Sequence, residues 1–198
     1  MCSKNNFVLS IVAQDIGKRY GRNWVFRHLN FELEKGSKTA ISGKNGSGKS
    51  TLLQIISGYL SPSKGSIHFT PKPPEETDIT LIGPYTELIE EFTLKEFLAF
   101  HAKFRQPGID FHEMADRASL PMNKRIADYS TGMKQRTKLI TAFFFENDLI
   151  LLDEPTANLD EEGFDWWKTE ISIKSTETII IATNQSNEKD ICPNAIDL

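Results

Sequence analysis

Residues 43–50 read GKNGSGKS and place three glycines and two lysines in eight consecutive positions. A polyphosphate must lie against a row of backbone N–H groups, and a Cβ on that row would hold the phosphates away. Lys49 can supply a positive charge to the terminal phosphates, and the Ser50 hydroxyl can ligate Mg²⁺. The spacing predicts a phosphate-binding loop. Its predicted binding residues are Gly43, Lys44, Asn45, Gly46, Ser47, Gly48, Lys49, Ser50 and Thr51.

A second group of chemically useful residues follows the apolar run at positions 149–152. Asp153 stands where a carboxylate can hold Mg²⁺ through water, so we expect the metal to be shared by Ser50 and Asp153. Glu154 can polarise an attacking water as a general base. Many strands end in solvated acids, but a phosphate-binding loop upstream favours the catalytic interpretation.

A third group is the sequence YSTGMKQR at residues 129–136, which opens a predicted helix. Ser130 and Thr131 can cap this helix, and its free N–H groups can then bind a second anion. An ordinary helix cap explains the same residues equally well, so both interpretations stay open at this point.

The elements that must position these residues alternate between strands and helices. We expect strands at 7–16, 25–33, 37–42, 66–70, 79–83, 148–153 and 177–183, a turn at 17–23, and helices at 50–60, 93–104, 111–120, 130–145 and 161–173. Continuous apolar runs between helices indicate a parallel sheet covered on both faces. We predict one α/β domain over 1–198, with its core at 1–86 and 129–198 and a small inserted helical lobe at about 87–128.

Composition narrows the classes of function. The 198 residues are 39% apolar and 25% charged, with a net charge of −4, which is ordinary for a globular domain and gives no basic field for nucleic acid. Cys2 and Cys192 have no metal or redox spacing, so we expect free thiols in a reducing cytosol. We expect no transmembrane helix and no signal peptide, so another chain would have to hold this one at a membrane.

Taken together, these motifs resemble those of the ATP-binding subunits of ABC transporters, over essentially the whole length. Residues 45–51 match the Walker A motif, residues 149–160 match the Walker B strand and the D-loop, and residues 129–136 match the signature motif. The resemblance implies a P-loop NTPase fold with an N-terminal antiparallel β group. It also implies that Tyr20 stacks on adenine, and that Ser130 and Gly132 contact the ATP of a second subunit.

Three motifs depart from the family's pattern, at four positions in all. The first signature glycine is Thr131 and its glutamine is Met133, while Pro84 or Tyr85 stands nearest to the glutamine expected after the strand at 79–83. Asn184 occupies the position of a histidine that, in the family, reaches the γ-phosphate and aligns Glu154 with the attacking water. We therefore expect Asn184 to take part in catalysis, with slower turnover.

The resemblance implies an ATPase that binds ATP and Mg²⁺ and powers a membrane transporter from the cytoplasmic face of the cell membrane. It implies a homo- or heterodimer with another such subunit, together with separately encoded transmembrane permease subunits and no nucleic acid. The small size and the signature variant resemble haem-export and ABC-2-type systems, and we expect no C-terminal regulatory domain. Two alternatives stay open: a slow or non-hydrolysing regulatory subunit, and a soluble ABC ATPase that acts outside transport.

Overall fold

The structure is a computed structural model that describes residues 10–198. Cys2 and the first three residues of the strand predicted at 7–16 lie outside the described residues. The described chain forms two compact units. Unit 1 comprises 10–83, Asp148–Glu154 and Ser175–Leu198, and unit 2 comprises Pro84–Asn147 and Pro155–Lys174. The predicted boundaries of a helical lobe at about 87–128 stay a prediction.

Unit 1 contains the predicted parallel sheet, in the strand order β5-β6-β7-β3-β8. All of its pairings are parallel, and β6 and β7 are buried along their whole length, as their continuous apolar runs predict. The prediction that residues 177–183 form the last core strand was wrong, because β8 follows them and pairs with β3. The bounds are β3 Lys38–Ser42, β5 Ile79–Ile82, β6 Leu149–Asp153, β7 Thr178–Ala182 and β8 Asn194–Asp197.

A second, antiparallel sheet in unit 1 has the order β2-β1-β4, with β1 Ser10–Tyr20, β2 Asn23–Leu33 and β4 Lys64–Thr70. The turn predicted at 17–23 is much shorter, since β1 continues to Tyr20, which pairs with Asn23. A glycine stands at position 17 of β1 because the Trp24 ring packs against it: a Cβ there would lie only 2.8 Å from the ring. This sheet confirms the predicted N-terminal antiparallel group.

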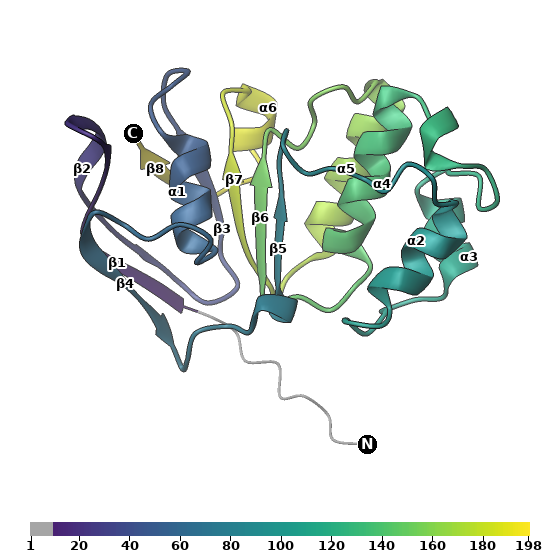
Figure 1. The fold of residues 1–198 in the computed structure, drawn as a ribbon, viewed down its shortest axis with the longest axis horizontal. Coiled ribbons are helices and arrows are strands. Elements are labelled where there is room, and N and C mark those ends of the chain that lie inside the picture. Colours follow the sequence, from purple (N-terminus) through teal and green to yellow (C-terminus); the bar gives the residue numbers. More distant parts are fainter. Residues whose placement is uncertain (1–9) are drawn as a thin grey trace. The chain divides into compact units, whose positions relative to one another are not determined.

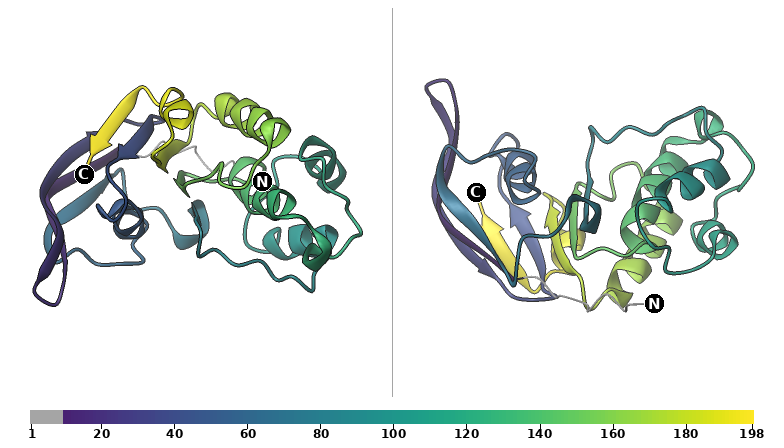
Figure 2. Two further views of the ribbon diagram at one scale, coloured as in Figure 1. Left: turned by 90° about the horizontal axis from the view of Figure 1, so that it is seen from above. Right: turned by 60° about the horizontal axis from the view of Figure 1, so that its bottom comes forward.

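Helix α1, Lys49–Ile56, joins the two sheets into one core. Its buried residues Leu52, Leu53 and Ile56 belong to a cluster that also contains Ile11 and Ile16 of β1. The same cluster includes apolar residues of β3, β6, β7 and β8, and Figures 1 and 2 show α1 between the two sheets. The phosphate-binding loop, residues 43–48, therefore runs from a buried central strand into a buried helix. Unit 1 also contains a short 3₁₀ helix, Glu76–Asp78, and the short helix α6, Ser186–Lys189.

Unit 2 is helical, with α2 Leu94–His101, α3 Phe111–Arg117, α4 Thr131–Phe143, α5 Glu161–Ile173 and a 3₁₀ turn at Ile126–Asp128. Side chains fix the helix starts: Thr93 and Glu96 form a capping box on α2, and Asp110 and Asp160 cap α3 and α5. In its interior, the Arg117 guanidinium donates to both carboxylate oxygens of the buried Glu170, at 3.1 and 2.5 Å. Along residues 10–198, no helix is both long and apolar enough to span a membrane.

Candidate functional site

The phosphate-binding loop takes a conformation that only glycine adopts easily at its closing position. Gly48 precedes α1 with φ 105° and ψ 16°. A Cβ on Gly48 would lie 2.5 Å from Val25 Cγ1 and 2.9 Å from Phe26 Cδ1. Gly46 also has a positive φ, 82°, but no atom lies within 4 Å of its absent Cβ. The loop is thus held closely against β2 on one side and is open on the other, where backbone N–H groups can face a ligand.

Lys49 is the cation of this loop, and only 7% of its surface is exposed. Its Nζ donates to the backbone oxygen of Gly43 at 3.1 Å and to that of Lys44 at 3.5 Å. Carbonyl dipoles hold the ammonium in place but do not neutralise it, so an anion beside it would be stabilised.

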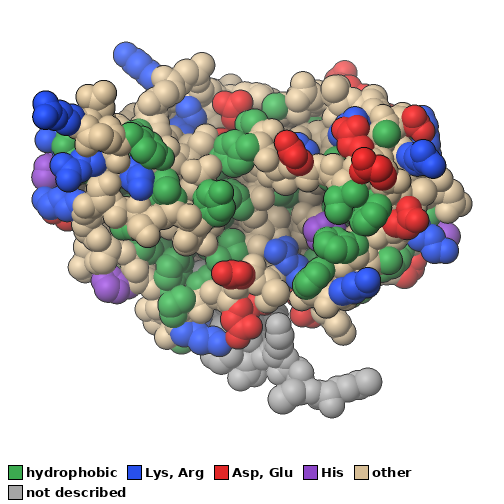
Figure 3. Space-filling view, viewed as in Figure 1, with side chains coloured by type: hydrophobic (Ala, Val, Ile, Leu, Met, Phe, Trp, Pro, Cys, Tyr) green, Lys and Arg blue, Asp and Glu red, His purple; other side chains and the backbone are tan. Residues whose placement is uncertain are grey.

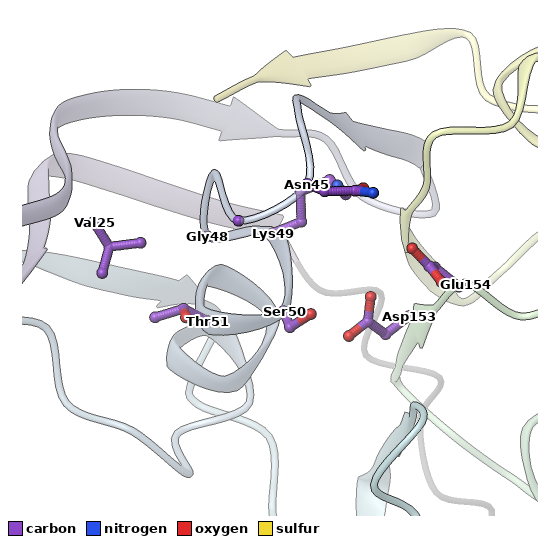
Figure 4. Close-up of a pocket in the computed structure, with 9 residues that line it drawn as sticks. Val25, Asn45, Gly48, Lys49, Ser50, Thr51, Asp153 and Glu154 are labelled. Atoms are coloured by element: carbon purple, nitrogen blue, oxygen red, sulfur yellow. The ribbon is translucent and has the colours of Figure 1, made fainter.

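The loop opens into a cavity of about 430 Å³ within unit 1 (Figure 4). The Ser50 hydroxyl and the Asp153 carboxylate face each other across this cavity (Figure 4), as oxygen donors suited to Mg²⁺. The loop supplies N–H groups and a cation for phosphates, so the residues fit a magnesium nucleotide. The cavity is lined by Val25, Asn45, Gly46, Gly48, Lys49, Ser50, Thr51, Asp153 and Glu154.

The two acids come from the end of β6 and differ in their surroundings. Asp153 is 3% exposed and closes the strand, whereas Glu154 is half-buried at the cavity. Glu154 has a positive φ of 50°, and its N–H donates to the Ala182 backbone oxygen at 2.9 Å. A left-handed conformation is unfavourable for a glutamate and is maintained by its surroundings, as is common at functional sites. The turn leaves the Glu154 carboxylate lining the cavity, where it can contact a water beside a bound phosphate.

Asn184 follows β7 and lies beside the phosphate-binding loop. The N–H of Thr183 donates to the Ile41 oxygen at 3.0 Å and so continues the β3–β7 pairing to the residue before Asn184. The Asn184 Nδ2 then donates to Asn45 Oδ1 at 2.5 Å. Asn184 itself is exposed and is not among the residues that line the cavity.

The signature residues form a helix start in unit 2. The Ser130 hydroxyl accepts from the Met133 N–H at 3.2 Å, so the cap that we predicted is present. A Cβ on Gly132 would lie 3.0 Å from the Asn158 backbone oxygen, which explains why a glycine stands there. Gln135 Nε2 donates to the Pro155 oxygen at 2.8 Å and so ties α4 to the segment after Glu154. The binding of a second anion by Ser130 and Gly132 stays a prediction.

Other predicted site residues lie outside the cavity lining. Tyr20 ends β1, is 54% exposed and has Lys18 Nζ 5.4 Å from its ring centre. Gly43, Lys44 and Ser47 belong to the loop but do not line the cavity. Sequence reasoning missed Val25, whose signal was weak: one apolar residue in a strand gives no indication that a glycine will pack against it.

Comparisons with known proteins agree with this geometry. Residues 26–157 match the family model described as ABC transporter. A candidate hemin import ATP-binding protein, HrtA, of Staphylococcus haemolyticus is 34% identical over 173 residues, which cover 78% of this chain and 77% of that protein. A sulfate/thiosulfate import ATP-binding protein, CysA, of Mesostigma viride is 29% identical over 197 residues, or 91% of this chain and 56% of that protein.

A solved dimeric ATP-binding cassette in a post-hydrolysis state, bound to ADP and Pi, has the same fold. The TM-score is 0.81 at 21% identity, covering 95% of this chain and 94% of that one. This likeness confirms the predicted α/β P-loop fold with its antiparallel and parallel sheets. The chain spans 56% to 77% of the two curated relatives described above. The family model matches more than half of the chain, and this chain therefore belongs to the ABC transporter family as one of its ATP-binding domains.

Proposed function

We propose that this chain binds ATP with Mg²⁺ and hydrolyses it to power a membrane transporter. The observation that supports this most directly is the cavity, in which the phosphate-binding loop, Ser50, Asp153 and Glu154 meet in one unit. The names of the relatives, which describe ATP-binding proteins of import systems, support the coupling to transport.

Hydrolysis requires an attacking water, a base and stabilisation of charge on the γ-phosphate. Glu154 Oε accepts a proton from the water as the water oxygen bonds to the γ-phosphorus. The bond between that phosphorus and the β–γ bridging oxygen breaks, which leaves ADP and phosphate. Lys49 Nζ and the loop N–H groups stabilise the negative charge on the phosphate oxygens. Ser50 and Asp153 would hold Mg²⁺, which neutralises phosphate charge when bound.

A second ATPase subunit would complete the site. The start of α4 is capped at Ser130 and presents exposed residues there, including Thr131, which suits it to contact a nucleotide held by another subunit. We propose a dimer in which each signature motif contacts the ATP of its partner. Ser130 and Gly132 would make that contact, while Tyr20 would stack on the adenine of its own subunit.

Membrane subunits are proposed as the second kind of partner, which would place the chain at the cytoplasmic face of a membrane. Figure 3 shows apolar side chains at the surface over the helical unit. Among the residues of unit 2, Phe104 is 59% and Phe100 37% exposed, and their rings pack edge to face at 5.3 Å. Such an exposed aromatic surface at the end of α2 is suited to contact another protein.

The test is the Glu154→Gln variant, with Glu161→Gln in the exposed first turn of α5 as the matched control. We expect Glu154→Gln to bind ATP as the parent does and to lose more than a hundredfold in turnover, because the base is removed while the loop is intact. We expect an ATP-bound dimer to accumulate in gel filtration. Turnover of the parent at the background level, no higher than that of Glu154→Gln, would favour a non-hydrolysing regulatory subunit, whereas equal and measurable turnover would mean that Glu154 is not the base.

A further inference from the structure

We propose that Asn184 acts on the nucleotide through Asn45, as a positioning residue that orients the Asn45 amide toward the terminal phosphate. This inference rests on the proposed ATPase function and assigns a specific role within it. It differs from the simpler expectation that Asn184 contacts the phosphate itself.

The backbone fixes where Asn184 lies. In the parallel register, Ile41 of β3 pairs with Ala182 of β7, and Asp153 of β6 pairs with the same Ala182. The carboxyl ends of these three strands meet at one edge of the sheet, so Asn184 follows the strand that lies between the phosphate-binding loop and Glu154. Thr183 is fully buried, its N–H is bonded to Ile41, and its hydroxyl accepts from the Gln185 N–H at 2.9 Å. The hydrogen bonds of Thr183 with Ile41 and Gln185 therefore fix the backbone on both sides of Asn184.

The direction of the hydrogen bond determines what Asn45 can offer to a ligand. A primary amide has an acceptor oxygen on one side and an NH₂ donor on the other. Because Asn184 donates to Asn45 Oδ1, the acceptor side of Asn45 is engaged by protein. The NH₂ of Asn45 is then the group left for the cavity that Asn45 lines. If the amide were turned the other way, its oxygen would face the phosphate, and the negatively polarised oxygen atoms would repel each other.

Without Asn184, nothing described in the structure sets this orientation. Asn45 is exposed, sits at the tip of the loop and precedes Gly46, whose absent Cβ has no neighbour within 4 Å. An exposed amide at such a position samples both orientations freely. Asn184 therefore favours the orientation in which the Asn45 NH₂ group faces the cavity. Only the affinity for a ligand that carries a γ-phosphate should depend strongly on this orientation.

The experiment measures equilibrium binding of Mg-ATP and Mg-ADP in the Glu154→Gln background, where turnover does not interfere. Variants are Asn184→Ala, Asn45→Ala, the double variant, and Gln185→Ala as a neighbouring exposed control. We expect each single alanine variant of the pair to weaken ATP by about tenfold, the effect of losing one hydrogen bond to a charged group. ADP affinity should change less than twofold, and the double variant should bind ATP as Asn45→Ala does.

A second comparison tests the direction of the hydrogen bond. Asn184→Asp replaces the donor with an acceptor and should turn the Asn45 oxygen toward the phosphate, so ATP binding should fall further than in Asn184→Ala. In the Asn45→Ala background this extra loss should become smaller, because no amide remains to turn. Thermal melts of each variant without nucleotide establish that the fold is retained.

Three results would overturn the proposal. Additive losses in the double variant would mean that Asn184 acts independently of Asn45. Equal losses for ATP and ADP would mean that the contact only stabilises the loop. An unchanged ATP affinity in Asn184→Ala would mean that the contact is idle. Failure of the proposed function is distinguishable from all three, since Lys49→Ala would then bind ATP as tightly as the parent.

Discussion

Replacement of Gly48 by alanine should abolish tight nucleotide binding through two separable effects. The first is conformational, because Gly48 has φ 105° and ψ 16°, a region in which an L-residue is strained. The second is steric, because the added Cβ would lie 2.5 Å from Val25 Cγ1 and 2.9 Å from Phe26 Cδ1. Both distances are far below van der Waals contact, so either the loop or β2 must move.

The magnitude follows from treating the two effects as independent. Left-handed backbone in a non-glycine residue costs roughly 1–2 kcal/mol, and overpacking a tight contact typically costs about 1–3 kcal/mol. If the loop relieves both by leaving its binding conformation, ATP affinity falls by about 2–5 kcal/mol, or roughly thirtyfold to several thousandfold. Gly46→Ala adds only the conformational effect, since no atom lies within 4 Å of the new Cβ. It should lose no more than about thirtyfold.

Fluorescence titration with a nucleotide analogue measures these affinities, and thermal melts report whether the strain unfolds the domain instead. Combining Gly48→Ala with Val25→Ala should recover part of the loss, because the closest clashing atom is gone. Val25→Ala alone is the control, since Val25 also lines the cavity. Parent-like affinity of Gly48→Ala, or a double variant no better than it after this correction, would refute the steric reasoning.

Three further predictions concern the proposed adenine contact, a half-buried histidine and a partly buried ion pair. Tyr20→Ala should weaken ATP by about 1–2 kcal/mol while Tyr20→Phe stays near the parent, and equal losses for alanine and tryptophan in a titration would indicate packing instead of stacking. Burial and the nearby Arg105 lower the pKa of His101 to about 4. The unfolded chain takes up this proton first, so stability should fall as the pH drops from about 6.5 to 4. Melts at pH 7 and 5 should show a smaller drop for His101→Leu than for an exposed control, His112→Leu. Glu170→Ala removes the closer carboxylate partner of Arg117, whose side chain is 35% exposed and still lies 3.8 Å from Glu113 Oε1. Urea unfolding should therefore show a loss of about 2 kcal/mol, below the full range for a buried pair. A loss under about 0.5 kcal/mol would mean that solvent replaces the partner.

The centre of the parallel sheet could be predicted because two of its strands are almost continuously apolar. The runs at β6 and β7 have no polar interruption and are buried throughout, so their type and parallel pairing were predicted correctly. Strand β8 was missed because Ile196 is its only buried residue. The predicted turn at 17–23 was too long. A glycine usually weakens a strand, so Gly17 indicated a turn, and its close contact with Trp24 could not be foreseen from the sequence.

The candidate site could also be predicted only in part. The loop and the two acids at the end of β6 could be predicted because each is a local sequence with a local geometry. The contact of Asn184 with Asn45 joins residues 139 positions apart, and no local pattern encodes such a pair. Val25 lines the cavity, where it also packs against Gly48. Contacts of this kind depend on tertiary packing, which the pattern of one segment does not determine.

The position of β3 in the sheet has a consequence for how the protein is made. Its hydrogen-bonded neighbours are β7 and β8, which begin at Thr178 and Asn194, whereas β1, β2, α1 and β4 are complete by Thr70. At roughly 5–20 residues per second on the ribosome, the backbone edges of β3 wait on the order of ten seconds for their partners. During that interval the unpaired backbone of β3 is open to pairing with other nascent chains. A chaperone that covers this segment until β7 and β8 have been made should therefore raise the yield of folded protein.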